Sequence, residues 1–127
     1  MKNTLSIASI SGLICVVLGA FGAHALKPLL SPHMLTVYET GVRYQFYHTL
    51  AIILIVVLYQ FNKSKKLVIA SYFFFAGILL FSGSLYLLAL TSIHQNSWTW
   101  LGPITPLGGL CFIIGWVYLF FGAKKLN

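Results

Sequence analysis

The chain has 127 residues, of which 59% are hydrophobic and only 7% are charged. Soluble domains carry about 25% charged residues, so this composition excludes an ordinary soluble protein and indicates an integral membrane protein. Eight basic residues and one acidic residue give a net charge of +7. The basic residues lie mostly at the edges of apolar segments, which is typical of membrane topology signals and not of a nucleic-acid-binding surface.

Four apolar segments are long enough to cross a membrane. A hydrocarbon core about 30 Å thick takes about 20 helical residues, and each segment meets this length. The segments are 4–26, 36–61, 67–90 and 102–122. They predict an all-α fold, a four-helix transmembrane bundle that forms a single domain over residues 1–127.

The first segment carries a regular stripe of small residues. The stripe consists of Ala8, Gly12, Cys15, Gly19 and Gly22, spaced by four and three residues. Such spacing places the residues on one helix face, where they let another helix approach closely. The segment also resembles a signal peptide, but it is longer than the usual ~7–15 apolar residues and is interrupted by glycines. We therefore interpret it as a membrane helix.

The second segment begins with a polar stretch, YETGVRYQFYHT at 38–49. This stretch holds the only acidic residue, Glu39, and the only arginine, Arg43, at the i,i+4 spacing that favours an ion pair. For Arg43 we favour such a pair near the headgroups over a ligand role. Gln45 and His48 lie on the opposite helix face, which can offer an amide and an imidazole to the interior.

The sequence leaves two roles open for His48. The imidazole either donates a hydrogen bond in its neutral form to a hydroxyl of another helix, or it binds a ligand or transfers a proton. The hydroxyls that we expect in reach are Ser82 and Ser84 in the third segment and Thr105 in the fourth.

The fourth segment repeats the small-residue stripe of the first. Its stripe consists of Gly108, Cys111, Gly115, Tyr118 and Gly122. We predict helix packing through the glycines of both stripes. The positions are Gly12, Gly19, Gly22, Gly108 and Gly115. The two cysteines are interpreted as buried thiols that act as small hydrophobic groups.

The lysines predict how the bundle is oriented in the membrane. In a four-helix bundle both chain ends and the turn at 62–66 lie on one side, and this side carries most of the lysines. They are Lys2, Lys63, Lys65, Lys66, Lys124 and Lys125. Since positive residues mark the cytoplasmic side, we expect both termini in the cytoplasm.

This topology places the polar groups of all four helices at one depth, in the outer half of the bundle. We therefore expect a small polar cup there, since ionisable residues at membrane depth are by default candidates for function. Its candidate ligand-binding residues are Glu39, Arg43, Gln45, His48, Ser82, Ser84 and Thr105. No metal or cofactor is expected, because the sequence shows neither metal-ligand spacing nor a glycine-rich phosphate loop.

Four motifs in this order resemble a known family. They are GAFGAHAL at 19–26, YETGVRYQFYHTLA at 38–51, FAGILLFSGSLYLLAL at 75–90 and LGPITPLGGLCFIIGW at 101–116. The chain is similar over nearly its whole length to the small bacterial inner-membrane proteins of the YgdD and YwdK type, an uncharacterised family. The resemblance implies four transmembrane helices and a location in the plasma membrane. It implies no activity and no catalytic residue.

Two functions are consistent with these features. A third, an enzyme that acts on a lipid or a quinone, ranks last, because no nucleophile with a neighbouring base is evident. The first is a structural or interaction protein that forms homo-oligomers or accompanies a larger membrane complex, since the glycine stripes are suited to helix contacts. The alternative is a carrier or binding protein for a small polar or amphipathic ligand in the polar cup. Membrane lipid is the expected surrounding partner, and no nucleic acid is expected.

Overall fold

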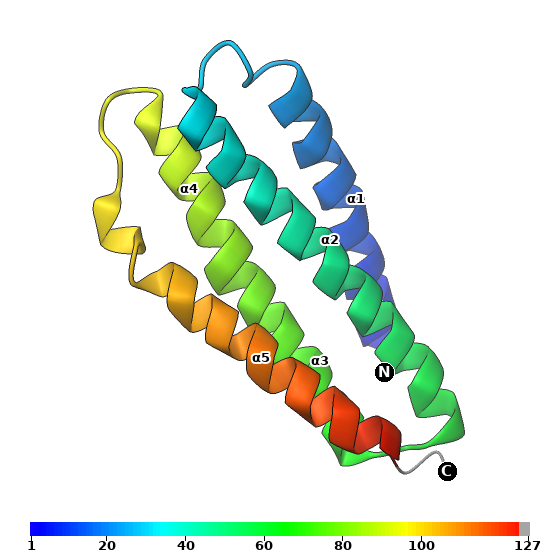
Figure 1. The fold of residues 1–127 in the computed structure, drawn as a ribbon. Coiled ribbons are helices and arrows are strands. Elements are labelled where there is room, and N and C mark those ends of the chain that lie inside the picture. Colours follow the sequence, from blue (N-terminus) through cyan, green and yellow to red (C-terminus); the bar gives the residue numbers. More distant parts are fainter. Residues whose placement is uncertain (125–127) are drawn as a thin grey trace.

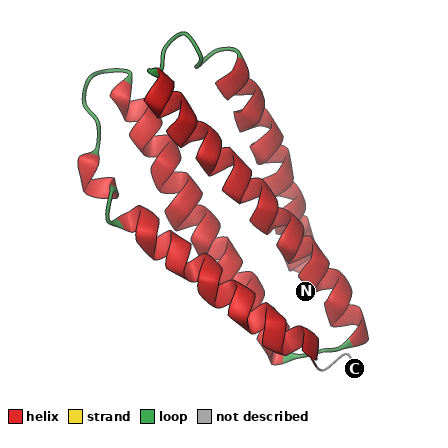
Figure 2. Cartoon of the chain, in the orientation of Figure 1, coloured by secondary structure: helices red, strands yellow, loops and turns green. Residues whose placement is uncertain are grey.

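The computed structural model describes residues 1–124. All secondary-structure elements in this part of the chain are helices (Figure 2). Its elements are α1 (Lys2–Ala23), α2 (Pro32–Phe61), α3 (Lys65–Gly77), the π-helical turn η1 (Ile78–Ser82), α4 (Gly83–Ser92), the 3-10 turn η2 (Thr99–Leu101) and α5 (Ile104–Ala123). Four helical stretches are long and apolar enough to cross a membrane, because α3, η1 and α4 continue into one another. The predicted all-α fold with four membrane spans is confirmed.

The second helix begins four residues earlier than the sequence predicted. Ser31 is its N-cap, and the Ser31 side chain accepts a hydrogen bond from the backbone N–H of Met34 at 3.2 Å. Pro32 takes the first helical position, where a backbone N–H would have no partner within the helix, so its absence costs nothing. The Ser31–Pro32 pair, which lies before the predicted segment 36–61, is therefore a helix start.

In the third span the helix passes through a π-helical turn. Five residues, Ile78–Ser82, form this turn between α3 and α4. Turns of this kind insert an extra residue into a helix and often occur at functional sites. Here the turn places Phe81 against α5, where Gly108 lies opposite its backbone. The sequence analysis did not predict this turn.

The helices are arranged around α2 and the α3–η1–α4 stretch, which pack on each other (Figure 1). α1 packs mainly on α2, and α5 packs mainly on α3 and η1. α2 and α5 have few contacts with each other. Space therefore remains between α2 and α5, and also between α1 and the third span. The arrangement therefore leaves two grooves, one on each side of α2.

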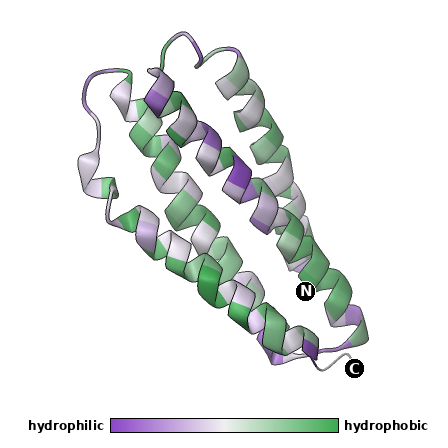
Figure 3. Ribbon diagram, in the orientation of Figure 1, coloured by the Kyte–Doolittle hydropathy of each residue, from purple (hydrophilic) through white to green (hydrophobic). Residues whose placement is uncertain are grey.

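Both chain ends and the turn between α2 and α3 lie at the same end of the bundle (Figure 1). The lysines of this end that the structure describes are Lys2, Lys63, Lys65, Lys66 and Lys124, and Lys125 lies outside the described residues. In α2 the hydrophilic residues gather in the half next to the loop from α1, while the half near the lysines is apolar (Figure 3). A cytoplasmic location of the lysine-rich end remains a prediction from charge.

The glycines of α5 lie where this helix meets the third span. A Cβ atom added at Gly108 would lie 2.3 Å from the backbone nitrogen of Phe81, and one at Gly115 would lie 2.6 Å from the Phe74 ring. Both distances are shorter than any van der Waals contact, so α5 approaches this closely only because side chains are missing there. The stripe of α5 is thus occupied within the chain.

The glycines of α1 face α2. A Cβ atom at Gly12 would meet Thr49 at 3.7 Å, and one at Gly19 would meet Val42 at 3.6 Å, which are ordinary contacts. Only Gly22 lies tightly, 2.7 Å from the Tyr38 ring by the same measure. The stripe of α1 is therefore also turned toward a helix of the same chain, with less crowding than the stripe of α5.

Candidate functional site

Gln45 bridges three helices with its side-chain amide. The amide nitrogen donates to the Ser11 carbonyl oxygen in α1 at 3.0 Å, and the amide oxygen accepts from the Tyr86 hydroxyl in α4 at 2.6 Å. The Ser11 hydroxyl lies 2.8 Å from that of Thr49, which extends the network along α2. The amide of Gln45 thus has partners on both its ends, and the network ties α1, α2 and α4 together.

The predicted serine and threonine residues also bond to neighbouring helices. Ser82 donates to the Gly41 carbonyl oxygen in α2 at 2.7 Å. The Ser84 and Thr105 hydroxyls lie 2.6 Å apart and connect α4 with α5. In an apolar surrounding such bonds hold helices together, because a free hydroxyl there has no water to bond. These three residues therefore join helices and do not line a shared cavity.

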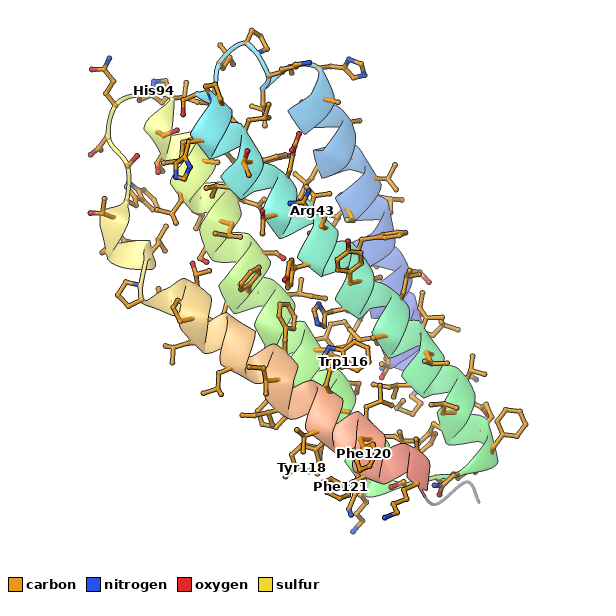
Figure 4. The ribbon with its side chains drawn as sticks, viewed as in Figure 1. Arg43, His94, Trp116, Tyr118, Phe120 and Phe121 are labelled. Atoms are coloured by element: carbon orange, nitrogen blue, oxygen red, sulfur yellow. The ribbon has the colours of Figure 1, made fainter. Side chains whose placement is uncertain are left out.

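Glu39 and Arg43 lie apart from these networks. Both side chains are exposed at the edge where α1 and α2 meet, and Figure 4 shows Arg43 between these two helices. The guanidinium donates to the Thr40 hydroxyl at 3.2 Å and forms no ion pair with Glu39, although the structure describes both residues. The expected pair is absent, and the structure does not form the single polar cup. The polar groups face three different directions around α2 because the helix turns 100° per residue.

His48 is buried and has hydrogen-bonding partners on both ring nitrogens. Its Nδ1 lies 2.7 Å from the Tyr44 carbonyl oxygen, and the Trp116 indole N–H donates to its Nε2 at 3.1 Å. A carbonyl oxygen can only accept a hydrogen bond, so Nδ1 carries the hydrogen. An indole N–H can only donate one, so Nε2 carries none, and His48 is the neutral Nδ1–H tautomer. Of the two roles left open by the sequence, the structural one fits, but its partners are Tyr44 and Trp116 and not the expected hydroxyls.

Trp116 is a site residue that sequence reasoning missed. Figure 4 shows it on the side of α5 that faces α2. Membrane proteins place tryptophan mostly at the two interfaces, so a tryptophan deep in the apolar segment 102–122 was the available signal.

An aromatic groove of about 800 Å³ lies between α2 and α5. We call it the aromatic groove, and its aromatic lining residues are Tyr44, Tyr47, His48, Phe81, Phe112 and Trp116. The His48 and Phe112 rings stack with centroids 3.5 Å apart, and Tyr44 lies 4.8 Å from Phe81. The rings therefore contact one another and form a nearly continuous aromatic surface.

Two tyrosine hydroxyls of this groove have no hydrogen-bonding partner within residues 1–124. Tyr44 is 39% exposed and Tyr47 is 54% exposed, so both side chains are open to the groove and its surroundings. At ~1.5 Å per residue they lie roughly 18–23 Å along a helix about 45 Å long, close to the middle of α2. Hydrocarbon around a membrane span offers no hydrogen bond, so these two phenols are the polar groups of the site that the described residues leave without a partner.

A second groove of about 460 Å³ lies on the other side of α2, between α1 and the third span. We call it the apolar groove. Aliphatic side chains such as Ile10, Ile14 and Leu79 line it, together with Gly83. The polar groups at its base belong to the Gln45 network, whose hydrogen bonds are already made. Of the two grooves, only the aromatic one offers unused hydrogen-bonding groups.

The comparison with known proteins identifies the family. The family described as "Protein of unknown function (DUF423)" matches residues 18–109, which is more than half of the chain. This chain belongs to the DUF423 family. The resemblance seen in the four sequence motifs is thereby confirmed.

Similar proteins extend over nearly the full length. The UPF0382 membrane protein YwdK of Bacillus subtilis is 41% identical over 126 residues, which cover 98% of this chain and 98% of YwdK. The UPF0382 inner membrane protein YgdD of Escherichia coli K12 is 43% identical over 123 residues, which cover 97% of this chain and 90% of YgdD. A UPF0382 membrane protein of Haemophilus influenzae is 42% identical over 127 residues, covering 98% and 97%. This member of the DUF423 family is thus a multi-pass protein of the bacterial cytoplasmic membrane.

No solved structure matches the chain.

Proposed function

We propose that this integral membrane protein binds a small amphipathic molecule in the aromatic groove between α2 and α5. The observation that carries the proposal is the pair of unpartnered hydroxyls of Tyr44 and Tyr47 near the middle of the membrane-spanning helix α2. A hydroxyl without a hydrogen bond in an apolar surrounding costs about 1–3 kcal/mol. A ligand that accepts these bonds would remove this cost and gain the corresponding binding energy.

The groove is better suited to a ligand than the polar cup expected from the sequence. Most residues of that cup form bonds between helices, so a ligand would have to break them. His48 alone belongs to both sets, and in the groove it is a buried ring that stacks on Phe112 and accepts a hydrogen bond from Trp116. The groove volume of about 800 Å³ lies within the usual range of roughly 300–1,000 Å³ for small-molecule sites.

The proposal is binding without catalysis. The polar side chains that line the groove are two phenols and an imidazole whose nitrogens both have partners. Catalysis would need a nucleophile beside a free base, and these lining residues, all described by the structure, do not provide one. Carrying or storing a bound molecule needs only the complementary surface.

Blocking the groove tests the proposal. Gly109 lines the aromatic groove, and a Cβ atom there would meet only the Phe81 ring at 3.9 Å, so a side chain can start from this position without a backbone clash. We expect Gly109→Leu to fill the groove and to reduce the amount of a co-purifying molecule by about tenfold or more. The measurement is mass spectrometry of solvent extracts from protein purified out of its native membrane.

Gly83→Leu is the matched control. Gly83 lines the apolar groove, and the nearest atom to its added Cβ is 4.0 Å away, so this variant fills the other groove with equally little strain. It should retain the molecule at the wild-type level. Equal amounts of the co-purifying molecule in wild type and both variants would contradict the proposal. Loss of the molecule in the Gly83 variant alone would contradict it as well.

A second function, that of an accessory or oligomer-forming membrane protein, is favoured by the position of α1. This helix packs mainly on α2, so apolar residues such as Leu13 and Val16 are more than half exposed. A second copy or a helix of a larger complex would cover this face. The glycine stripes no longer support this function, because they contact helices of the same chain. Single-molecule counting of subunits in lipid bilayers tests it, and a monomer at all protein-to-lipid ratios would exclude self-association.

A further inference from the structure

We infer that the aromatic groove takes an uncharged, lipid-soluble compound with a flat ring that carries carbonyl groups, which is the chemistry of the quinones. This inference rests on the proposed function and adds the class of ligand. Three properties of the groove lead to it: its aromatic lining, the kind of hydrogen-bonding group it offers, and the lack of cations in its lining.

The aromatic lining contains one stacked set of rings that is fixed in position. The His48 and Phe112 rings are almost parallel, with an angle of 7° between their planes, and Tyr44 stacks on His48 at 24°. Two hydrogen bonds prevent His48 from turning, one to Tyr44 and one from Trp116. His48 and Phe112 are buried, so Tyr44, which is 39% exposed, is the ring of this set that another planar ring can reach. Offset stacking is a favoured arrangement of aromatic groups.

The hydrogen-bonding groups of the groove call for acceptors. The indole N–H of Trp116 is already used, so the free groups are the hydroxyls of Tyr44 and Tyr47. The centroids of the two tyrosine rings lie 6.0 Å apart and both residues line the groove, so one ring compound in the groove can lie beside both. Carbonyl oxygens accept from both phenols and bring no N–H or O–H that would itself need a partner in hydrocarbon.

The lining of the groove disfavours a charged ligand. No lysine or arginine is among the residues that line the groove, all of which the structure describes. A carboxylate or phosphate at mid-membrane without a cation is strongly disfavoured. A neutral carbonyl compound meets no such barrier. Leu110 and Ile113 on α5 are exposed beside the groove, and an apolar tail would lie against them.

Trp116 offers a direct measurement of this binding. The chain has three tryptophans, and Trp98 and Trp100 lie outside the groove. The parent protein for the test is therefore the full chain with Trp98→Phe and Trp100→Phe, in lipid nanodiscs. A benzoquinone with a decyl tail should quench its fluorescence saturably. Tyr44→Phe and Tyr47→Phe should each weaken binding by about 3- to 10-fold, which corresponds to one lost hydrogen bond.

Two comparisons separate the ligand class from the function. Decylbenzene has the ring and tail but no carbonyls, and it should displace the quinone at least about tenfold more weakly. Gly109→Leu in the same parent should leave only unsaturable quenching from quinone dissolved in the lipid, while Gly83→Leu should behave as the parent does. Thermal unfolding of each variant in the same nanodiscs shows that the fold is kept.

The other outcomes overturn one statement or both. If decylbenzene competes as well as the quinone, or if the tyrosine variants bind normally, the carbonyl class is wrong and a groove for apolar rings remains. If quenching by the quinone never saturates, but the amount of a co-purifying molecule still falls in Gly109→Leu, the ligand class is wrong and the proposed function stands. If neither signal depends on Gly109, both fail.

Discussion

Replacing Gly108 by alanine should destabilise the protein by about 1–3 kcal/mol or more, since overpacking forces the backbone to move. The added methyl group would lie 2.3 Å from the backbone nitrogen and 2.7 Å from the Cα atom of Phe81. Backbone atoms cannot turn aside as a side chain can, so α5 would have to separate from η1. The free energy of unfolding in mixed detergent micelles measures this effect.

The neighbouring glycine provides the control. At Gly109 the added methyl group has only an ordinary contact with the Phe81 ring, at 3.9 Å. Alanine is favoured over glycine inside a helix by about 0.5–1 kcal/mol, so Gly109→Ala should stabilise the protein by that amount. The two adjacent substitutions should therefore differ in sign. A destabilisation of equal size at both positions would show that α5 does not pack on η1 in this register.

Replacing Gln45 by leucine should lower the free energy of unfolding by about 1–3 kcal/mol. The amide holds Ser11 in α1 and the Tyr86 hydroxyl in α4, and leucine would leave that hydroxyl without a partner. Membrane-protein hydrogen bonds are worth about 0.6 kcal/mol on average, and leaving a buried group unpaired adds about 1–3 kcal/mol. The same unfolding measurement applies, with thermal melting in nanodiscs as a second readout.

Gln60 is the matched control for this substitution. It lies in the same helix but is exposed, and its amide bonds only to the Val56 carbonyl oxygen one turn away, at 3.4 Å. Gln60→Leu should change the stability by less than about 0.5 kcal/mol, as surface substitutions usually do. If both glutamine variants lose the same stability, the network across three helices contributes nothing specific.

The site was predictable in part. The spacing of Gln45 and His48 indicated that both side chains face the interior, and both are buried. The spacing also placed Glu39 and Arg43 on another face, yet the expectation of a common depth drew all four into one cup. Equal depth along a helix does not bring side chains together, because their directions around the helix axis differ by 100° per residue. This is why the structure has separate bonds between helices and a groove in place of the cup.

The partners of these residues come from distant parts of the chain. Gln45 bonds to Ser11, 34 residues away, and to Tyr86, 41 residues away, while His48 bonds to Trp116 at a separation of 68 residues. No local pattern specifies such pairs. They follow from which helix packs beside α2, and that in turn depends on close approaches such as Gly108 against Phe81.

By itself the sequence determined the four membrane spans, their approximate ends and the family, because crossing a bilayer is a local requirement that one apolar helix meets with its own residues. Only the tertiary structure decided which polar groups are used up between helices and which stay free. Tyr44 and Gln45 are neighbours in the chain, yet the amide of Gln45 reaches two other helices while the hydroxyl of Tyr44 remains open in a groove. The physical reason is that satisfaction of a hydrogen bond depends on what lies opposite a side chain, and a sequence of single residues does not contain that information.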